Sequence, residues 1–369
     1  MISISLDDER LAWRGIGSLE TIGDAVRVWR VPHDHRQFHA PELLAVADIP
    51  TCSRIGFRTN AQFIELDVEL DAKTADGPVT FEAVIDGEVV SSTSAAKTSA
   101  VKLGPLPDGF HDIELWLPNQ HSVVLTGMRI SDEADLTVSP MTLLRWITYG
   151  SSITQNRTAP SATATWPGIV ARRNRLDVTN LGFAGQCLLD PLIAEQIART
   201  PAEMISLCVG INIHNLASMS QRAYRSSLIG FIRTVRAGHP DTPLAVISPI
   251  ASPKREHRPS HPRYFPGFVQ KLLWNKRSSL PNGMVGPTLD ELRQITHDVV
   301  DVLSAADPNL RLVDGRVLLG EKDASLLTDG LHPGAEGLRL MADRCEEKLL
   351  PLLRGCTDNI VDDDSGETP

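Results

Sequence analysis

The pattern of apolar residues changes along this chain of 369 residues, and the change constrains the fold more than any other feature. Up to about residue 137, short segments alternate apolar and polar residues, which is typical of strands with one face in water. Beyond that point, strand-like apolar runs alternate with longer helical patterns, which indicates successive βαβ units. We therefore expect an all-β domain followed by an α/β domain.

The first part, residues 1–137, favours a β-sandwich or jelly roll, with frequent turns and no convincing helix. Asp86-Gly87 is a typical two-residue hairpin turn between two of the expected strands. The strands that the alternation predicts most clearly lie at 53–58, 62–70, 79–85, 111–117 and 122–130.

In residues 138–355 the alternation predicts a parallel sheet with helices on both faces. The expected strands lie at 143–149, 177–183, 203–209, 243–248 and 310–313, and the expected helices at 166–175, 189–199, 219–238, 287–305 and 334–353. After Arg354 the chain has five acidic residues and no Lys or Arg. We expect residues 356–369 to form a disordered acidic tail.

Two short motifs carry candidate chemistry. Gly150-Ser151-Ser152 ends a predicted strand, and a serine there would sit at a helix N-terminus, whose backbone N–H groups can hold a developing anion. Asp329 precedes His332 by three residues, so its carboxylate can reach Nδ1–H and leave Nε2 to take a proton from a serine. Each motif has a plainer reading, an ordinary turn for the first and an Asp-Gly turn beside a helix cap for the second.

Two further segments have the form of oxyanion-hole donors. A predicted strand at 177–183 runs into a turn at Gly185, and another apolar run ends at Gly210 and Asn212. A backbone N–H at Gly185 and the side-chain amide of Asn212 are both suitable donors. Either segment alone is more simply the exit of a strand into a loop. The order of all four motifs along one chain is much less expected by chance.

In these four blocks the chain resembles the SGNH (GDSL-type) hydrolases, over residues 143–353. The resemblance implies a flavodoxin-like three-layer α/β sandwich with a parallel sheet. It implies that Ser152 is the nucleophile, and that the oxyanion is held by the N–H groups of Ser152 and Gly185 and the amide of Asn212. Asp329 and His332 match the remaining pair of the triad. Some members also carry an N-terminal β-sandwich similar to carbohydrate-binding modules.

One position departs from the family pattern. Ser151 stands where the family usually has an aspartate before the nucleophile, which bears on how Ser152 is positioned. Ser151 is the other serine that could attack, but the register of the block favours Ser152. The nucleophile turn of α/β-hydrolases, Gly-x-Ser-x-Gly, is excluded because Thr154 stands at its second glycine.

Composition narrows the class of protein. A hydrophobic content of 42% and a charged content of 22% are ordinary for a globular chain, and the net charge of −10 argues against nucleic acid as a partner. We expect neither a signal peptide nor a membrane-spanning segment, because residues 1–10 have no basic region with a long apolar core and no apolar run approaches ~18 residues. Five scattered cysteines favour a reducing, cytoplasmic location. His33, His35 and His39 hint at a metal site, but they lie in the β part without a fixed element under them, and we expect no metal or cofactor. The sequence indicates no oligomeric state.

Residues 251–286 form a long irregular stretch that is the best candidate for selecting the substrate. It holds basic and aromatic residues, among which Arg255, His257 and Tyr264 are candidate substrate contacts. The alternative for each of them is a solvated surface position.

Together these observations favour a serine esterase that hydrolyses a small acyl ester, of a carbohydrate or a natural product, through an acyl-serine intermediate. The alternative is an acyltransferase that moves the acyl group to a hydroxyl of a sugar or natural product. A binding protein without catalysis, in which the sandwich domain does the work, is less favoured because all the site residues are present.

Overall fold

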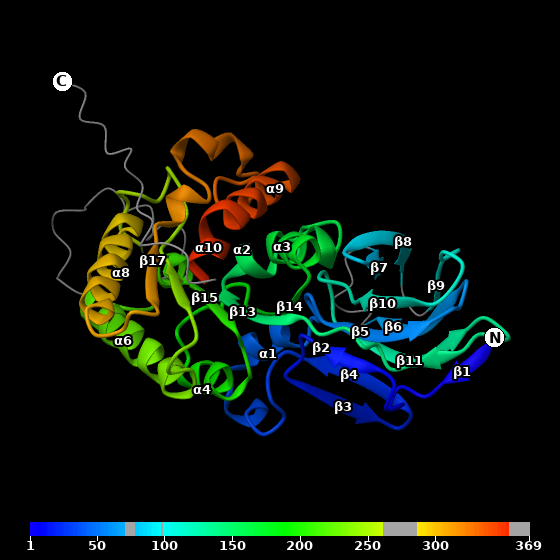
Figure 1. Ribbon diagram of the computed structural model, residues 1–369. Helices are drawn as coiled ribbons and strands as arrows, with labels where there is room; N and C mark the ends of the chain where they lie inside the picture. The colour runs from blue at the N-terminus through cyan, green and yellow to red at the C-terminus, as the bar shows by residue number, and fades with distance from the viewer. Residues whose placement is uncertain (71–77, 97–98, 261–285, 354–369) are drawn as a thin grey trace. The chain divides into compact units, whose positions relative to one another are not determined.

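The computed structural model describes residues 1–70, 78–96, 99–260 and 286–353 of the chain (Figure 1). Its internal contacts divide the chain into two compact units. The first comprises Met1–Thr148 with Thr154–Phe183, and the second Tyr149–Ile153 with Ala184–Pro369. The boundary at residue 137 stays a prediction, and the expected tail at 356–369 lies outside the described residues.

Two antiparallel sheets make up most of the first unit. One has the order β3-β4-β11-β6-β9 with β1 paired to β11, and the other the order β12-β5-β10-β7-β8 with β2 paired to β5 (Figure 1). The strand bounds are β1 Ile2–Ile4, β2 Ala12–Arg14, β3 Ser18–Ile22, β4 Ala25–Trp29, β5 Arg54–Thr59, β6 Ile64–Leu70, β7 Val79–Ile85, β8 Glu88–Ala95, β9 Ser99–Leu103, β10 His111–Trp116, β11 Val123–Ile130 and β12 Leu136–Thr137.

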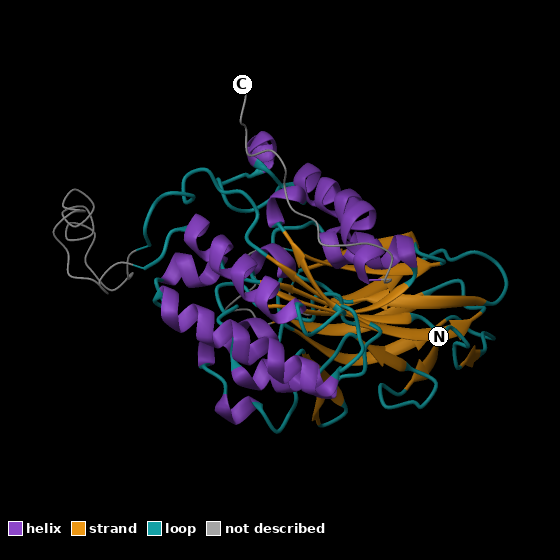
Figure 2. Ribbon diagram, turned by 60° about the vertical axis from the view of Figure 1, so that its left-hand side comes forward, coloured by secondary structure: helices purple, strands orange, loops and turns teal. Residues whose placement is uncertain are grey.

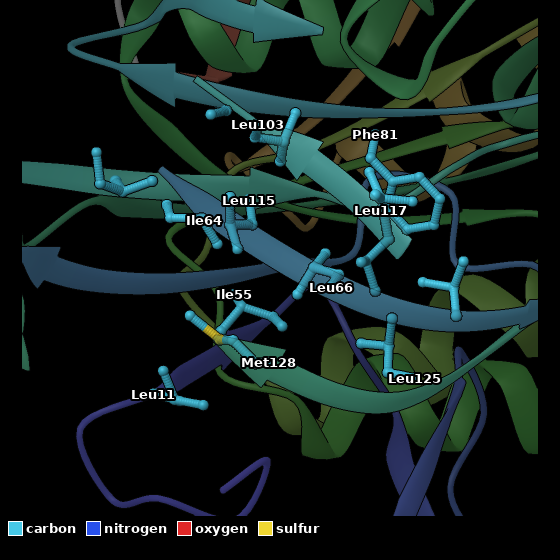
Figure 3. Packing of buried hydrophobic residues seen from close by; sticks show 14 of the residues in the cluster. Leu11, Ile55, Ile64, Leu66, Phe81, Leu103, Leu115, Leu117, Leu125 and Met128 are labelled. Carbon is cyan, nitrogen blue, oxygen red and sulfur yellow. The ribbon is translucent and has the colours of Figure 1, made fainter. Parts of the chain in front are cut away.

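The two sheets share one hydrophobic core, which confirms the all-β prediction for the N-terminal part. Leu66 and Leu125 come from the first sheet, Ile55 and Leu115 from the second, and all four belong to one buried cluster (Figure 3). Alternate residues of β6 are buried, as the sequence alternation predicts for a strand with one wet face. Burial of this apolar surface is the main stabilising term for such a sandwich.

The hairpin prediction is confirmed, and one other expectation for this part is wrong. Asp86 and Gly87 both have positive φ, at 51° and 84°, as a tight turn between β7 and β8 requires. The chain also forms a helix, α1 Pro41–Ala47, where none was expected. Proline in its first turn and Glu42 beside it favour a helix start, but seven residues are too few to show a clear helical period.

A five-stranded sheet of order β14-β13-β15-β16-β17 belongs to the α/β part. The strands β15, β16 and β17 pair in parallel, which confirms the predicted sheet type. The strand bounds are β13 Leu144–Gly150, β14 Leu176–Gly182, β15 Met204–Cys208, β16 Leu244–Ile247 and β17 Leu310–Val313. The ends of these strands agree with the predicted ranges within one or two residues, because each is a short apolar run bounded by turn residues.

Helices cover both faces of β15–β17 in the second unit, as expected for a flavodoxin-like fold (Figures 1 and 2). On one side α4, α6 and α8 pack against one another, and on the other side lie α9 and α10. The helix bounds are α2 Ser152–Gln155, α3 Trp166–Asn174, α4 Pro191–Arg199, α5 Ile211–Leu216, α6 Gln221–Gly238, α8 Leu289–Ser304, α9 Ala335–Arg344 and α10 Leu350–Leu353, with 3-10 turns at Arg36–Phe38, Ala162–Ala164, Gly315–Val317 and Glu321–Leu326.

The C-terminal helix differs from the prediction of one continuous helix over 334–353. A π-helical segment, Cys345–Leu349, separates α9 from α10. Pro351 in α10 has no N–H to donate and crowds the preceding turn, which is a common reason for a helix to depart from the α-helical ladder. Among the described residues, no helix has both the length and the apolar character needed to cross a membrane.

Candidate active site

The first element of the site is the turn after β13. Ser151 is 2% exposed, and its Oγ accepts a hydrogen bond from the Ile153 N–H at 3.2 Å. Its hydroxyl therefore caps the first turn of α2. Ser152 begins α2 and is half-buried, so its hydroxyl is the more accessible of the two. The buried Ser151 hydroxyl thus helps to form the turn that presents Ser152.

A chain of hydrogen bonds joins Ser152 to His332 and Asp329. Ser152 Oγ lies 2.8 Å from His332 Nε2, and His332 Nδ1 lies 2.7 Å from Asp329 Oδ2. An ionised carboxylate can only accept, so Nδ1 carries the proton and Nε2 is left to accept the serine hydroxyl. The structure thus places together three residues that the sequence separates by as many as 180 positions.

The turn that carries Asp329 and His332 is held by its own backbone. The Asp329 Oδ1 accepts the N–H groups of Leu331 at 2.9 Å and His332 at 2.7 Å, while Oδ2 faces the imidazole. Gly330 has a φ of +74°, a conformation that glycine adopts without strain. Asp329 therefore shapes the turn as well as orienting the ring.

The same contacts govern the ionisation of Asp329. Partial burial acts to raise its pKa, but the N–H and ring of His332 and the N–H of Leu331 outweigh it and lower the pKa to about 2. The carboxylate is thus the form present over the whole physiological range. It needs no proton transfer to serve as the orienting acceptor for His332.

We expect this lowered pKa to appear as a pH-dependent contribution to stability. A carboxylate whose pKa is lower in the folded than in the unfolded chain stabilises the fold above about pH 4, and the contribution is lost as the pH falls through about 2. The difference in Tm between wild type and Asp329→Asn should therefore be present at pH 5 and shrink between pH 4 and 2. Calorimetry over that range measures it, and a difference that persists unchanged at pH 2 contradicts the assignment.

The predicted oxyanion donors lie on segments that are hydrogen-bonded to each other. Asn212 is 3% exposed in the first turn of α5, and its Oδ1 accepts the Cys187 N–H at 3.0 Å. This bond fixes the amide plane and leaves the Nδ2 hydrogens as donors. Gly185, two residues before Cys187, has a φ of +75° and open space at its Cα. Cys187 is a partner that sequence patterns did not single out.

The three predicted substrate contacts have different outcomes. Arg255 is half-buried and donates to Asn215 Oδ1 at 3.2 Å and to the Gly330 carbonyl at 3.0 Å. His257 is exposed on the same loop. Tyr264 lies outside the described residues. The structure therefore associates Arg255 with the Asp329–His332 turn, which its place in the sequence did not indicate.

A second group of serine, histidine and aspartate lies at the end of β16, and its geometry is unsuited to nucleophilic catalysis. His297 Nε2 lies 3.4 Å from Ser248 Oγ and 3.6 Å from Asp314 Oδ2, so one ring nitrogen faces both groups. Ser248 Oγ also accepts the Gly315 N–H at 3.0 Å. Within the part of the chain that the structure describes, no group of three or more His, Cys, Asp and Glu side chains is arranged to hold a metal ion.

Comparisons with known protein families give one match in each part of the chain. Residues 145–261 match the GDSL-like lipase/acylhydrolase family, and residues 11–126 match the SsfX3 N-terminal domain. A comparison with curated protein sequences gives no significant match.

Solved structures similar to this chain include an acyltransferase and esterases. The salicylyl-acyltransferase SsfX3 from a tetracycline biosynthetic pathway is 25% identical, with a TM-score of 0.81 over 95% of this chain and 97% of that one. Family two carbohydrate esterases share the fold. That of Clostridium thermocellum is 16% identical, with a TM-score of 0.60 over 92% and 98% of the two chains. That of Cellvibrio japonicus is 12% identical, with a TM-score of 0.60 over 95% and 98%.

Proposed function

The chain belongs to the SGNH (GDSL-type) hydrolase family in its two-domain form, and we propose that it is a serine esterase that cleaves a small acyl ester through an acyl-Ser152 intermediate. The observation that carries the proposal is the continuous hydrogen-bonded chain from Asp329 through His332 to Ser152, with distances of 2.7 and 2.8 Å. A serine hydroxyl is a weak nucleophile until an adjacent base removes its proton, and this chain supplies that base.

In the first half-reaction His332 Nε2 removes the Ser152 proton as Oγ attacks the ester carbonyl. The negative charge then develops on the carbonyl oxygen, where the N–H groups of Ser152 and Gly185 and the Asn212 amide are the proposed donors. The imidazolium passes its proton to the leaving alcohol as the ester bond breaks. Asp329 keeps the ring oriented and stabilises its charged form without taking the proton.

In the second half-reaction the acceptor resolves the acyl-serine. His332 removes a proton from water, the resulting nucleophile attacks the acyl carbon, and Ser152 leaves with the proton that His332 returns. The products are a carboxylic acid and the regenerated serine.

We also propose a cytoplasmic location, because the five cysteines are an odd number without regular spacing.

The second candidate is an acyltransferase, and one observation favours it. The structural similarity to a salicylyl-acyltransferase extends over both domains, with 95% of this chain covered. The donor would then be an activated ester or thioester, and the acceptor a hydroxyl of a sugar or natural product. The chemistry at Ser152 stays the same, and only the group that attacks the acyl-serine changes.

One experiment tests both candidates. Wild type and Ser152→Ala are incubated with p-nitrophenyl acetate and with longer and aromatic esters, with and without hydroxyl acceptors, and p-nitrophenolate and acyl products are quantified. We expect a Ser152-dependent release and an acyl adduct on Ser152 by mass spectrometry. Release that rises with an acceptor, together with acylated acceptor, assigns transfer; release that is unaffected assigns hydrolysis. Ser151→Ala is the matched control and should still form the adduct.

No release from wild type above the Ser152→Ala background, with any ester or acceptor, contradicts both enzymatic candidates. The remaining alternative is then a binding protein without catalysis. Titration of the protein with candidate ligands of the sandwich domain would test that alternative.

A further inference from the structure

We propose that Arg255 is a positioning residue, whose guanidinium ties the turn that carries Asp329 and His332 to the helix that carries Asn212. The inference rests on the proposed function of Ser152. It replaces the expectation that Arg255 contacts the substrate, and it assigns to this side chain a role that acts through His332 and Asn212.

The first contact is with the carbonyl of Gly330, between the two acid-base residues. Gly330 O accepts the Arg255 Nη1–H at 3.0 Å and the Ser252 hydroxyl at 2.8 Å. The N–H of Gly330 already bonds to Leu327 O inside the turn. The Gly330 carbonyl is thus the group through which Arg255 and Ser252 hold the turn in place. These two bonds are important for the turn because the Asp329 side chain is 56% exposed, so packing against that side chain restrains the turn little.

The second contact is with α5. Arg255 Nε donates to Asn215 Oδ1 at 3.2 Å, and Asn215 lies three residues after Asn212 in that helix. The guanidinium is planar and presents its donors in a fixed fork. One rigid group therefore sets the spacing between the turn of the general base and the helix of the proposed oxyanion donor. A lysine ammonium, which is a single point on a flexible chain, cannot make both contacts in the same way.

The loop that presents Arg255 is itself anchored in the protein interior. The Ser252 N–H donates to Glu256 Oε1 at 2.8 Å, and Glu256 forms a buried ion pair with Arg293 of α8 at 2.8 Å. The Arg255 N–H donates to Ser252 O at 2.7 Å and its Nη1 to Ser252 Oγ at 3.1 Å. The side chain is therefore held in place before any substrate arrives, as a positioning residue requires.

The expected consequence is a loss of rate without a loss of substrate affinity. A displacement of the base or the oxyanion donor by about 1 Å costs roughly a hundredfold in rate. Removal of Arg255 therefore lowers kcat for a neutral ester by up to about a hundredfold. It leaves KM for that ester unchanged, because no substrate contact is removed.

The test compares Arg255→Ala, Arg255→Lys and the matched control Arg258→Ala, an exposed arginine of the same loop. Steady-state kinetics use a neutral p-nitrophenyl ester, and the labelling of Ser152 by a neutral fluorophosphonate is followed by intact mass. We expect both kcat and labelling rate to fall in Arg255→Ala, to recover little in Arg255→Lys, and to recover in part when guanidinium is added to Arg255→Ala. Arg258→Ala should behave as wild type.

A higher KM with unchanged kcat in Arg255→Ala overturns the inference in favour of substrate binding, and so do unchanged kinetics. If Arg255→Ala fails to fold, Asn215→Ala removes the contact of Arg255 with α5 and leaves its contact with Gly330, and it should lower kcat with KM unchanged. No change in kcat overturns the inference. Ser152→Ala separates this result from the proposed function. If that variant is labelled as fast as wild type, Ser152 is not the nucleophile, and the proposed function fails together with the inference.

Discussion

Replacing His332 by alanine is expected to lower the rate of ester turnover by roughly 10⁶-fold, as loss of the base does in serine hydrolases. The reason is that Ser152 Oγ loses the imidazole whose Nε2 lies 2.8 Å away and can take its proton. The part of the rate that remains comes from binding and from the oxyanion donors.

Because nucleophile and base act as a unit, their effects should not add. Ser152→Ala, His332→Ala and the double variant should all retain the same low rate, within about tenfold. Single-turnover release of p-nitrophenolate from a large excess of enzyme measures rates this slow. A double variant that is slower than either single variant by the product of the two losses contradicts the assignment of Ser152 and His332 to one triad.

The second Ser/His/Asp group provides the matched control for these variants. Ser248→Ala removes a hydroxyl 3.4 Å from His297, and we expect turnover close to that of wild type. Ser248 Oγ accepts the Gly315 N–H, so a modest loss of stability is expected, on the order of 1 kcal/mol. If Ser248→Ala keeps its fold but loses turnover, the nucleophile is Ser248 and not Ser152, and the proposal is contradicted.

Replacing Arg54 by alanine is expected to lower the free energy of unfolding of the protein by about 3–5 kcal/mol. Arg54 in β5 is fully buried and pairs with Glu114 and Asp177, both at 2.7 Å. Its Nη1 also donates to the Val178 carbonyl at 3.0 Å. Removal leaves two carboxylates and a backbone acceptor without this partner in a place that water reaches poorly, which is the costly case for buried ion pairs.

The contacts of Arg54 with β14 are the reason that Arg54→Ala should strongly lower the stability of the first unit. Asp177 and Val178 belong to β14, an outer strand of the five-stranded sheet. A second buried arginine, Arg30, donates to Asn180 O at 2.9 Å and Gly182 O at 2.6 Å further along the same strand. Burial lowers the pKa of Arg30 to about 9. The two arginines satisfy carbonyls along a strand that would otherwise present an open edge.

The control for Arg54 lies on the same strand. Arg58 pairs with Asp112 at 2.8 Å, but its side chain is 37% exposed, and Arg58→Ala should change the unfolding free energy by less than about 1 kcal/mol. Thermal unfolding of the two variants should differ by about 10 °C in Tm. Equal Tm values for Arg54→Ala and Arg58→Ala would show that the buried contacts of Arg54 stabilise the protein no more than a surface pair.

The local part of the site follows from sequence alone. Asp329 and His332 are three residues apart, and the side chain of the first bonds the backbone and ring of the second within a single turn. The Gly150-Ser151-Ser152 turn is equally local, since the Ser151 hydroxyl bonds the N–H two residues on. Such contacts depend on a few neighbouring φ and ψ angles, and residue types report these angles well.

The parallel sheet and the sandwich were predictable for a related reason. A strand or helix with one buried face shows a period in its apolar residues, and a strand buried on both faces shows a short continuous apolar run. Short elements such as α1 and α5 leave too few residues to show a period. The interruption of the C-terminal helix before α10 depends on how the backbone accommodates Pro351, and the spacing of apolar residues gives no information about that.

The sequence by itself determined the fold class and the order of the motifs, because apolar period, turn residues and residue chemistry are all local properties. Only the tertiary structure decided which distant groups meet. Arg255 and Arg54 are ordinary basic residues in the sequence, yet their partners include the carbonyls of Gly330 and Val178, 75 and 124 positions away. Every residue has such a carbonyl, so no residue type marks the one that a buried arginine will hold, and the fold alone selects it.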